Sequence, residues 1–191
     1  MARIGVLALQ GDVSEHVLAM QKAFTGEVVA VRKRGQIETC QALVLPGGES
    51  TTICRELTRF GLNEELKAAD AAGKPILATC AGLVLAAKEI EGDSKVQPLG
   101  LMDTTISRNA FGPQKESFEV DLKVAGLDKP YRAVFIRAPA IARVGKEVEV
   151  LARVGRAIVA ARQKNILALA FHPELTDDRR IHQMFLKMLE E

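Results

Sequence analysis

The chain is poor in aromatic side chains and contains no tryptophan. Aromatic residues make up 4% of its 191 residues, so few side chains could stack on nucleic-acid bases. No charge of one sign dominates, because 26 Lys and Arg face 24 Asp and Glu, for a net charge of +2. The short basic run at residues 32–34 is better explained as a solvated strand end than as a nucleic-acid contact. Nucleic acid is therefore not an expected partner.

Long apolar runs and paired cysteines are also missing. No apolar stretch approaches the ~20 residues of a membrane span, and no signal-peptide pattern precedes the first strand pattern. The three cysteines, Cys40, Cys54 and Cys80, show no close pairing and no metal-ligand spacing. We interpret Cys40 and Cys54 as ordinary small residues. We expect a cytoplasmic protein without a disulfide framework, a bound metal or a membrane partner.

The N-terminal part alternates strand and helix patterns. Nearly wholly apolar runs are typical of strands that are covered on both faces, and they occur at residues 4–9, 28–31, 42–45 and 75–78. Apolar residues recur at helical spacing in four segments: after the first run, after the loop at residue 50, after residue 62, and at residues 179–190. Asp12, with Glu15 three residues later, is expected to cap the first helix. This alternation predicts an α/β fold with a mostly parallel sheet flanked by helices.

The rhythm changes after Gly92. Shorter strand patterns, interrupted by Gly and Pro, occur at residues 104–107, 116–122, 133–136, 148–154 and 157–162. They predict a short antiparallel extension before the chain returns to the main sheet at residues 166–171. Because no linker or repeat interrupts the sequence, we expect residues 1–191 to form a single domain.

Cys80 follows a predicted strand in Ala78-Thr79-Cys80-Ala81-Gly82. Small residues on both sides of a nucleophile, between a strand and a helix, are typical of a nucleophile elbow. The turn exposes the sulfur, and the N-terminal end of the next helix favours its thiolate form. Taken alone, Cys80 could be a buried structural thiol. The elbow pattern favours a nucleophile.

His172 and Glu174 follow another predicted strand end. A carboxylate close to a histidine can orient the ring toward a nucleophile, so Cys80, His172 and Glu174 form a candidate catalytic triad. Glu174 could instead be a solvated loop carboxylate. His16 and His182 lie on predicted helices and receive no chemical role. His16 is expected to face either a partner or solvent.

The loop Pro46-Gly47-Gly48-Glu49-Ser50-Thr51 has two interpretations. It could be a turn in which Ser50 or Thr51 caps a helix. Alternatively, the missing side chains of Gly47 and Gly48 let backbone amides approach a developing oxyanion, together with the amide near Ala81. The loop lacks the Gly-Lys-Ser/Thr ending of a phosphate-binding P-loop.

Two arginines could recognise a carboxylate. Arg137 follows the apolar run at residues 133–136, and Arg108 follows another strand pattern. Each could bind a substrate carboxylate bidentately or form a surface ion pair.

The carboxyl ends of the strands in a parallel sheet lie at one edge of the sheet. Four predicted segments occupy such strand ends, at Gln10, Gly47, Cys80 and His172. The sequence therefore predicts a site at that edge.

Several blocks together resemble the glutaminase subunits of pyridoxal 5'-phosphate synthases, a family of triad-type glutamine amidotransferases. The blocks occur in the order Val6-Leu7-Ala8-Leu9-Gln10-Gly11, Leu45-Pro46-Gly47-Gly48-Glu49-Ser50-Thr51-Thr52, Thr79-Cys80-Ala81-Gly82, Arg108-Asn109-Ala110-Phe111-Gly112, Phe135-Ile136-Arg137-Ala138-Pro139 and Phe171-His172-Pro173-Glu174-Leu175. The cysteine and histidine blocks mark the wider superfamily, and the others narrow the resemblance to this subunit.

The resemblance implies specific roles. Cys80 would be the nucleophile of a triad with His172 and Glu174, and Gln10 would lie near the oxyanion region and the synthase interface. L-glutamine would be bound at the positions of Gly48, Glu49, Ser50, Arg108, Ile136 and Arg137. The ammonia would pass to a separate barrel-shaped synthase subunit in a hetero-oligomer, and the reaction would need no cofactor.

Two positions depart from the family pattern: Ala78 replaces a common Gly, and Pro113 stands where Arg is frequent. Neither position belongs to the triad. Two alternatives remain open from the sequence: another elbow-type cysteine hydrolase, and a regulatory subunit that keeps the fold without the chemistry. Arg108 and Arg137 favour glutamine over other substrates, because a glutamine site must hold an α-carboxylate.

Overall fold

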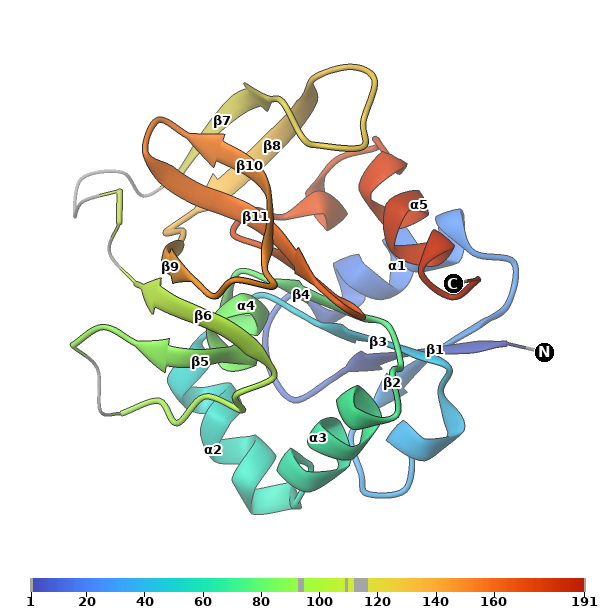
Figure 1. The fold of residues 1–191 in the computed structure, drawn as a ribbon. Coiled ribbons are helices and arrows are strands. Elements are labelled where there is room, and N and C mark those ends of the chain that lie inside the picture. The colour runs from blue at the N-terminus through green and yellow to red at the C-terminus, as the bar shows by residue number, and fades with distance from the viewer. Residues whose placement is uncertain (1, 93–94, 109, 112–116, 191) are drawn as a thin grey trace.

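The computed structural model describes residues 2–92, 95–108, 110–111 and 117–190. Within them, ten strands form one sheet, and β7 (Ser117–Leu122) pairs with β8 (Tyr131–Ile136) in a second, smaller one. The path through the large sheet is β2-β1-β3-β4-β12-β11-β9-β6-β5, and β10 joins it on β11. Figure 1 shows helices on both faces of this sheet. Asn109, Gly112 and Pro113, which belong to the predicted site blocks and departures, lie outside the described residues.

The parallel half of the large sheet contains the predicted apolar runs. Its strands, in chain order, are β1 (Arg3–Leu7), β2 (Glu27–Val31), β3 (Ala42–Leu45), β4 (Ile76–Thr79) and β12 (Ile166–Leu169). Every residue of β3, β4 and β12 is buried, because helices cover both faces of these strands. The predicted α/β class with a mostly parallel sheet is confirmed.

The helices divide between the two faces of the sheet (Figure 1). One face carries α1 (Val13–Ala23) and α5 (Arg180–Lys187), which contact each other. The opposite face carries α2 (Ser50–Phe60) and α3 (Asn63–Ala71), and the short α4 (Ala81–Ala86) packs against α2. Two 3-10 turns, η1 (Ile37–Thr39) and η2 (Pro173–Leu175), complete the helical elements of the described chain. None of its helices has the length and apolar character to cross a membrane.

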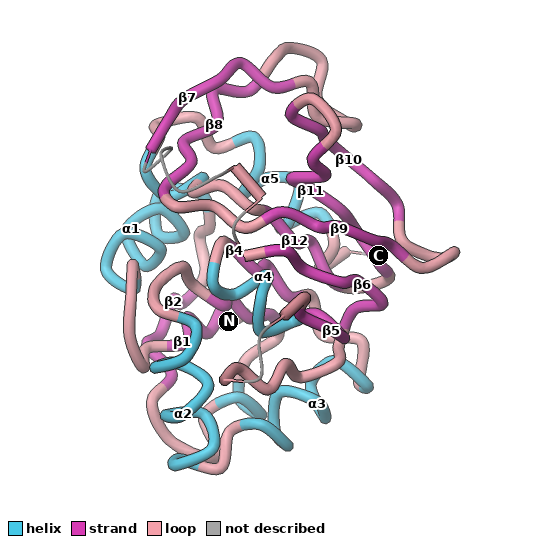
Figure 2. The backbone as a smooth tube through the Cα atoms, turned by 90° about the vertical axis from the view of Figure 1, so that its left-hand side faces the viewer, coloured by secondary structure: helices cyan, strands magenta, loops and turns pink. Residues whose placement is uncertain are grey.

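The antiparallel extension continues the large sheet beyond β12 (Figure 2). It contains β6 (Met102–Ser107), β9 (Ala140–Val144), β10 (Glu149–Val154) and β11 (Ala157–Gln163), with β5 (Ala87–Ile90) parallel to β6 at its edge. The sequence did not predict β5 or β9. The two central residues of β5 are charged and exposed, so this strand has no apolar run to reveal it.

The start of α1 differs from the prediction. Asp12 precedes the helix, but its side chain makes no capping hydrogen bond, and Glu15 instead accepts one from Ser14. The predicted capping box is therefore wrong. The prediction that His16 faces solvent or a partner is wrong as well, because His16 is fully buried.

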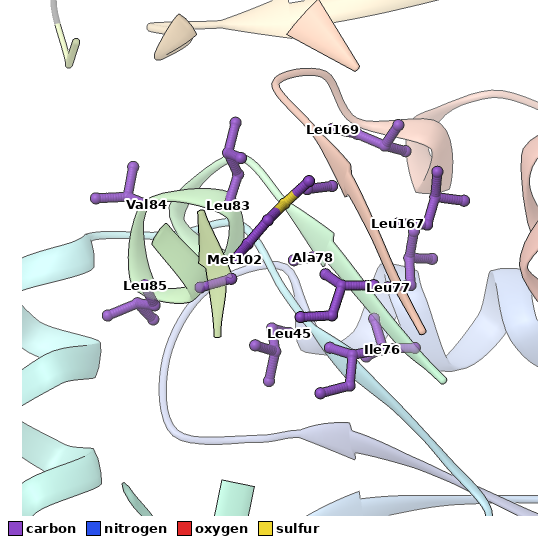
Figure 3. Packing of buried hydrophobic residues seen from close by; sticks show 14 of the residues in the cluster. Leu45, Ile76, Leu77, Ala78, Leu83, Val84, Leu85, Met102, Leu167 and Leu169 are labelled. Atoms are coloured by element: carbon purple, nitrogen blue, oxygen red, sulfur yellow. The ribbon is translucent and has the colours of Figure 1, made fainter. Parts of the chain in front are cut away.

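Hydrophobic side chains from several elements surround β4. Figure 3 shows Leu77 and Ala78 of β4 among side chains of β3, β12, α4 and β6, including Leu45, Leu83 and Met102. These side chains belong to one cluster of buried hydrophobic residues. The packing holds α4 against the sheet, so the turn that joins β4 to α4 has a firm support.

Candidate active site

Cys80 occupies the turn between β4 and α4. Its backbone has φ 48° and ψ −103°, a conformation that is uncommon for residues other than glycine. Its amide donates to Leu169 O at 2.8 Å, which ties the turn to the end of β12. A Cβ on Gly82 would lie 2.0 Å from Leu45 O, so only glycine lets α4 approach β3 this closely. The elbow predicted from the small residues is present, with Ala78 buried in β4.

His172 reaches the elbow from the loop after β12. Its Nδ1–H donates to Glu174 Oε1 at 2.6 Å, since a carboxylate can only accept, and its backbone amide donates to Val134 O at 2.9 Å. Cys80, His172 and Glu174 are all buried. The structure therefore brings the three predicted triad residues together and shows that Glu174 is not a solvated loop carboxylate.

Asp12 adds a second carboxylate to the same histidine. Its Oδ2 lies 3.3 Å from His172 Nδ1, and this interaction lowers the pKa of Asp12. Burial alone would lower the pKa of His172. The interactions of its ring with Asp12, Cys80 and Glu174 outweigh that burial and raise the pKa of His172 above its ordinary value of 6.5. The site therefore favours a protonated His172, the form that stabilises a neighbouring thiolate.

Asp12 was expected only as a helix cap. A signal for its role was available, because it follows the same strand end as Gln10, and strand ends of a parallel sheet converge. Asp12, His172 and Glu174 also place potential metal-ligand atoms within 4.8 Å of one another. Their spacing is accounted for by the contacts of both carboxylates with His172 Nδ1. The absence of a metal from the reaction stays a prediction.

The loop at residues 46–49 is held by the loop after β1. Gln10 Oε1 accepts a hydrogen bond from the Glu49 amide at 2.7 Å, and Gly47 O accepts one from the Asp12 amide at 3.2 Å. A Cβ on Gly47 would lie 2.6 Å from His172 Cε1, so the loop runs directly against the imidazole ring of His172. The predicted neighbourhood of Gln10 and the glycine pair is therefore present.

Glu49 caps α2. Its carboxylate accepts hydrogen bonds from the amides of Thr51 at 3.0 Å and Thr52 at 2.7 Å. The interpretation in which Ser50 or Thr51 caps this helix is therefore wrong. Partial burial opposes ionisation of Glu49, but these hydrogen bonds outweigh it and lower its pKa to about 2.

A cavity of about 830 Å³ opens at Cys80. Ten of the predicted site residues line it: Gln10, Gly48, Glu49, Ser50, Cys80, Ala81, Arg108, Ile136, Arg137 and His172. Gly47 and Glu174 lie outside the lining, beside His172. Further lining residues, to which the sequence analysis gave no role in the site, are Gly11, Asp12, Val84, Glu91, Gly92, Lys95, Ser107 and Pro139. Glu91, Gly92 and Lys95 come from the segment after β5, which had no recognisable motif, and Ser107 is the last residue of β6.

The two predicted arginines converge on this cavity from different elements. Arg137 follows β8 and has φ 42°, so its backbone is strained at the cavity wall. Arg108 follows β6, and its Nη2 lies 3.7 Å from Glu49 Oε1. Cys80 Sγ lies 4.0 Å from the carbonyl oxygen of Ile136, next to Arg137. A ligand at the sulfur would therefore have guanidinium groups within the same cavity.

Fold and site define an α/β protein with a cysteine at a strand-to-helix elbow, beside a buried histidine–carboxylate pair. Comparison with known families gives the assignment within this class. The chain belongs to the SNO glutamine amidotransferase family, whose model matches residues 6–191. The resemblance inferred from the motifs is confirmed.

Individual relatives agree with this assignment. The chain is 60% identical over 187 residues to the pyridoxal 5'-phosphate synthase subunit PdxT of Methanothrix thermoacetophila, covering 98% of this chain and 100% of that protein. It is 53% identical to the protein of the same name from Halalkalibacterium halodurans, covering 100% and 96% of the two chains. A crystal structure described as a glutamine amidotransferase superposes with a TM-score of 0.92 at 46% identity, covering 98% and 99%.

Proposed function

We propose that this chain hydrolyses L-glutamine to L-glutamate and ammonia and supplies the ammonia to a pyridoxal 5'-phosphate synthase. The observation that carries the proposal is Cys80 on its elbow beside the His172–Glu174 pair, which are 2.6 Å apart, in a cavity that two arginines also line. The family assignment and the names of the relatives support the same reaction.

The first half of the reaction forms a thioester. The Cys80 thiolate attacks the side-chain amide carbon of glutamine, and the amide oxygen becomes an oxyanion. Backbone amides at Ala81 and in the Gly47–Gly48 segment stabilise that charge. Protonated His172 donates its proton to the leaving nitrogen, so that ammonia departs and the γ-glutamyl thioester remains.

The second half releases glutamate. Neutral His172 now takes a proton from a water molecule, and the resulting hydroxide attacks the thioester carbon. The carbon–sulfur bond breaks, the thiolate is restored, and His172 carries the proton again. Glu174 stays ionised and keeps the imidazole in one orientation through its contact with Nδ1.

Substrate binding involves the remaining cavity residues. Arg108 and Arg137 are the groups that could pair with the α-carboxylate, since a guanidinium matches a carboxylate bidentately. Gly48, Glu49, Ser50 and Ile136 complete the proposed glutamine site. Recognition of the α-groups distinguishes glutamine from the substrates of other elbow-type cysteine hydrolases.

The partner is inferred from the relatives, which are named as subunits of a pyridoxal 5'-phosphate synthase. A separate barrel-shaped synthase subunit would receive the ammonia in a hetero-oligomer. A cytoplasmic location, a single domain and a reaction without cofactor remain predictions. A regulatory subunit without chemistry is disfavoured, because all three triad residues are present, Cys80 and His172 line the same cavity, and His172 is hydrogen-bonded to Glu174.

Ammonia release from glutamine, measured with and without the synthase subunit, tests this proposal. We expect turnover of glutamine and none of peptides or of glutamine amidated at its α-carboxyl group. Hydrolysis of peptides in preference to glutamine would favour a different cysteine hydrolase. No turnover of any substrate in the presence of the partner would favour a regulatory subunit.

A further inference from the structure

Behind the catalytic pair lies a third buried histidine that the mechanism has not used. His16 sits on α1 with its side chain fully buried. Its Nε2 lies 2.9 Å from Thr79 Oγ1, the residue directly before Cys80. The same Nε2 lies 3.3 Å from Glu174 Oε2. One imidazole nitrogen therefore touches both the strand end that presents the nucleophile and the triad carboxylate.

The two oxygens of Glu174 have different surroundings. Oε1 accepts the hydrogen bond from His172, whereas Oε2 is buried and makes no hydrogen bond within the described part of the chain. A buried carboxylate oxygen without a donor is costly, because it has lost the water that would otherwise solvate it. His16 Nε2 is positioned to reduce that cost if it carries the proton.

The charge and tautomer of His16 follow from its environment. Burial lowers the pKa of His16, against the attraction of Glu174, so the ring is neutral and holds one proton. The other groups that act on it are His172, Asp12 and Glu15, and His182 faces it from α5. A proton on Nδ1 would direct the Nε2 lone pair at the Glu174 carboxylate. A proton on Nε2 gives the carboxylate and the Thr79 hydroxyl a donor and leaves a bare acceptor at the buried Nδ1, which has no partner within the described residues.

We propose that His16 is a positioning residue of the glutaminase site, with its Nε2–H shared between Thr79 Oγ1 and Glu174 Oε2. This inference rests on the proposed function. His16 holds the Glu174 carboxylate in the orientation that its other oxygen needs to bind His172 Nδ1. It also links that carboxylate to the end of β4, so the nucleophile and the acid–base pair keep a constant separation.

Two substitutions at His16 test the shared donor. His16→Leu keeps an apolar side chain of similar size and removes the donor, whereas His16→Gln keeps an N–H near the position of Nε2. For His16→Leu in complex with the synthase subunit, we expect kcat to fall about 10- to 100-fold, the effect of losing a hydrogen bond to a charged group. The KM for glutamine should stay within about twofold, since His16 does not line the cavity. His16→Gln should recover part of the lost kcat.

His182→Leu is the matched control. His182 is also fully buried and lies on α5, and burial, followed by the charge of His16, lowers the pKa of His182. Neither of its ring nitrogens has a hydrogen-bond partner among the described residues. Its replacement therefore measures the cost of removing a buried histidine from this packing layer, and we expect kcat to be unchanged.

Proton NMR of the full chain provides a readout that does not depend on glutamine turnover. The short His172 Nδ1–H···Glu174 hydrogen bond should give a low-field proton signal in the parent chain and in His182→Leu. In His16→Leu that signal should weaken or disappear, and the pH at which His172 titrates should fall toward 6.5, because Glu174 is no longer held against it. His16→Gln should retain both features in part.

Unchanged kcat and an unchanged low-field signal in His16→Leu would overturn the proposal. Equal losses in His16→Leu and His182→Leu would also overturn it, because the effect would then be one of packing. If His16→Leu does not fold, the comparison of His16→Gln with the parent chain decides by the same NMR signal. If the parent chain in complex with the synthase subunit fails to hydrolyse glutamine, the proposed function is wrong, whereas a low-field signal that still depends on His16 keeps the positioning role.

Discussion

Two helices begin at the same cavity in opposite ways. At the start of α2, Glu49 folds its carboxylate back onto the amides of Thr51 and Thr52. At the start of α4, Cys80 occupies the corresponding position with positive φ and without any side-chain cap. The first helix end is satisfied by its own sequence, and the second leaves its first amides to other partners. The comparison shows that one helix end at this cavity is closed by its own side chain, whereas the other keeps its first amides available to a ligand.

The conformation of Cys80 at the start of α4 carries backbone strain. A non-glycine residue at positive φ costs about 1–3 kcal/mol and persists only where the surrounding structure enforces it. Here the enforcing contacts are the hydrogen bond from the Cys80 amide to β12 and the close packing of Gly82 on β3. Glu49 needs no such support, since its cap conformation is extended.

The largest effect is expected when the sulfur at the start of α4 is removed. Cys80→Ala should abolish glutamine hydrolysis and leave the fold intact, because a small side chain fits the turn. A glutamine-like electrophile should label Cys80 and spare Cys40 and Cys54, which mass spectrometry of the labelled peptides can show. Cys54→Ala, outside the cavity lining, is the matched control and should keep full activity. Appreciable hydrolysis by Cys80→Ala would contradict the mechanism.

The next largest effect concerns the oxyanion donors. The Gly47 carbonyl is held by the Asp12 amide, and Gln10 holds the Glu49 amide, so the orientation of the Gly47–Gly48 peptide depends on the loop after β1. We expect the isolated chain to be a poor glutaminase and the synthase subunit to raise kcat about 100- to 1000-fold, the effect of one oxyanion donor.

Steady-state kinetics at saturating glutamine measures this activation. Gln10→Ala should weaken it and leave Cys80 reactive toward the electrophile. On addition of the synthase subunit, kcat should rise by a larger factor than the KM for glutamine falls. Equal turnover with and without the partner would count decisively against a gate at the Gly47–Gly48 peptide.

A smaller effect is expected at the carboxylate subsite. Arg137→Ala should raise the KM for glutamine about tenfold or more, because a hydrogen bond to a charged group contributes roughly 1.5–3 kcal/mol. Arg132→Ala is the control, since this arginine belongs to the adjoining strand β8 and pairs with Glu119 and Asp121 on the surface. An unchanged KM in Arg137→Ala would show that the α-carboxylate binds elsewhere.

The smallest effect belongs to the capped helix end. Glu49→Ala should destabilise the chain by about 1 kcal/mol at pH 7, the usual cost of losing an N-cap. Half of this side chain is exposed, so solvent screening limits its contribution. The pKa of Glu49 is lowered to about 2 in the folded chain from 4.5. The stabilisation is therefore present above about pH 4.5 and is lost as the pH falls toward 2.

Urea unfolding at pH 7 and pH 3 tests whether the stabilisation by Glu49 decreases as the pH falls. The difference in the free energy of unfolding between the parent chain and Glu49→Ala should shrink at the lower pH. Glu64→Ala on α3, where the side chain is exposed and pairs with Lys67, should show little difference from the parent chain at either pH. A difference in the free energy of unfolding that is larger at pH 3 than at pH 7 would contradict the low pKa of Glu49.

Local patterns account for the parts of the site that were predicted. The elbow depends on Cys80 and its immediate neighbours, and the His172–Glu174 pair depends on a spacing of two residues, so both can be recognised in a short stretch of sequence. The apolar runs revealed the buried parallel strands for the same reason. The charged strand β5 and the lining residues that follow it carried no such pattern.

His16 illustrates what a local sequence pattern can and cannot predict. It lies three residues after Val13 and four before Met20, so helical spacing already placed it on the apolar face of α1. The sequence could therefore have indicated its burial. Nothing in that spacing could indicate that the same face meets Glu174 and Thr79, which come from distant parts of the chain.

Residues that are close in the chain were enough to predict the α/β class, the elbow at Cys80 and the pairing of His172 with Glu174. The folded chain was needed to show that Asp12 is a partner of His172 rather than a helix cap, and that His16 lies against the Glu174 carboxylate. Such contacts cannot be read locally, because the charge and tautomer of a buried group depend on whichever donors and acceptors surround it. Those neighbours are brought together by the packing of α1 against the loop after β12, a contact that spans most of the chain.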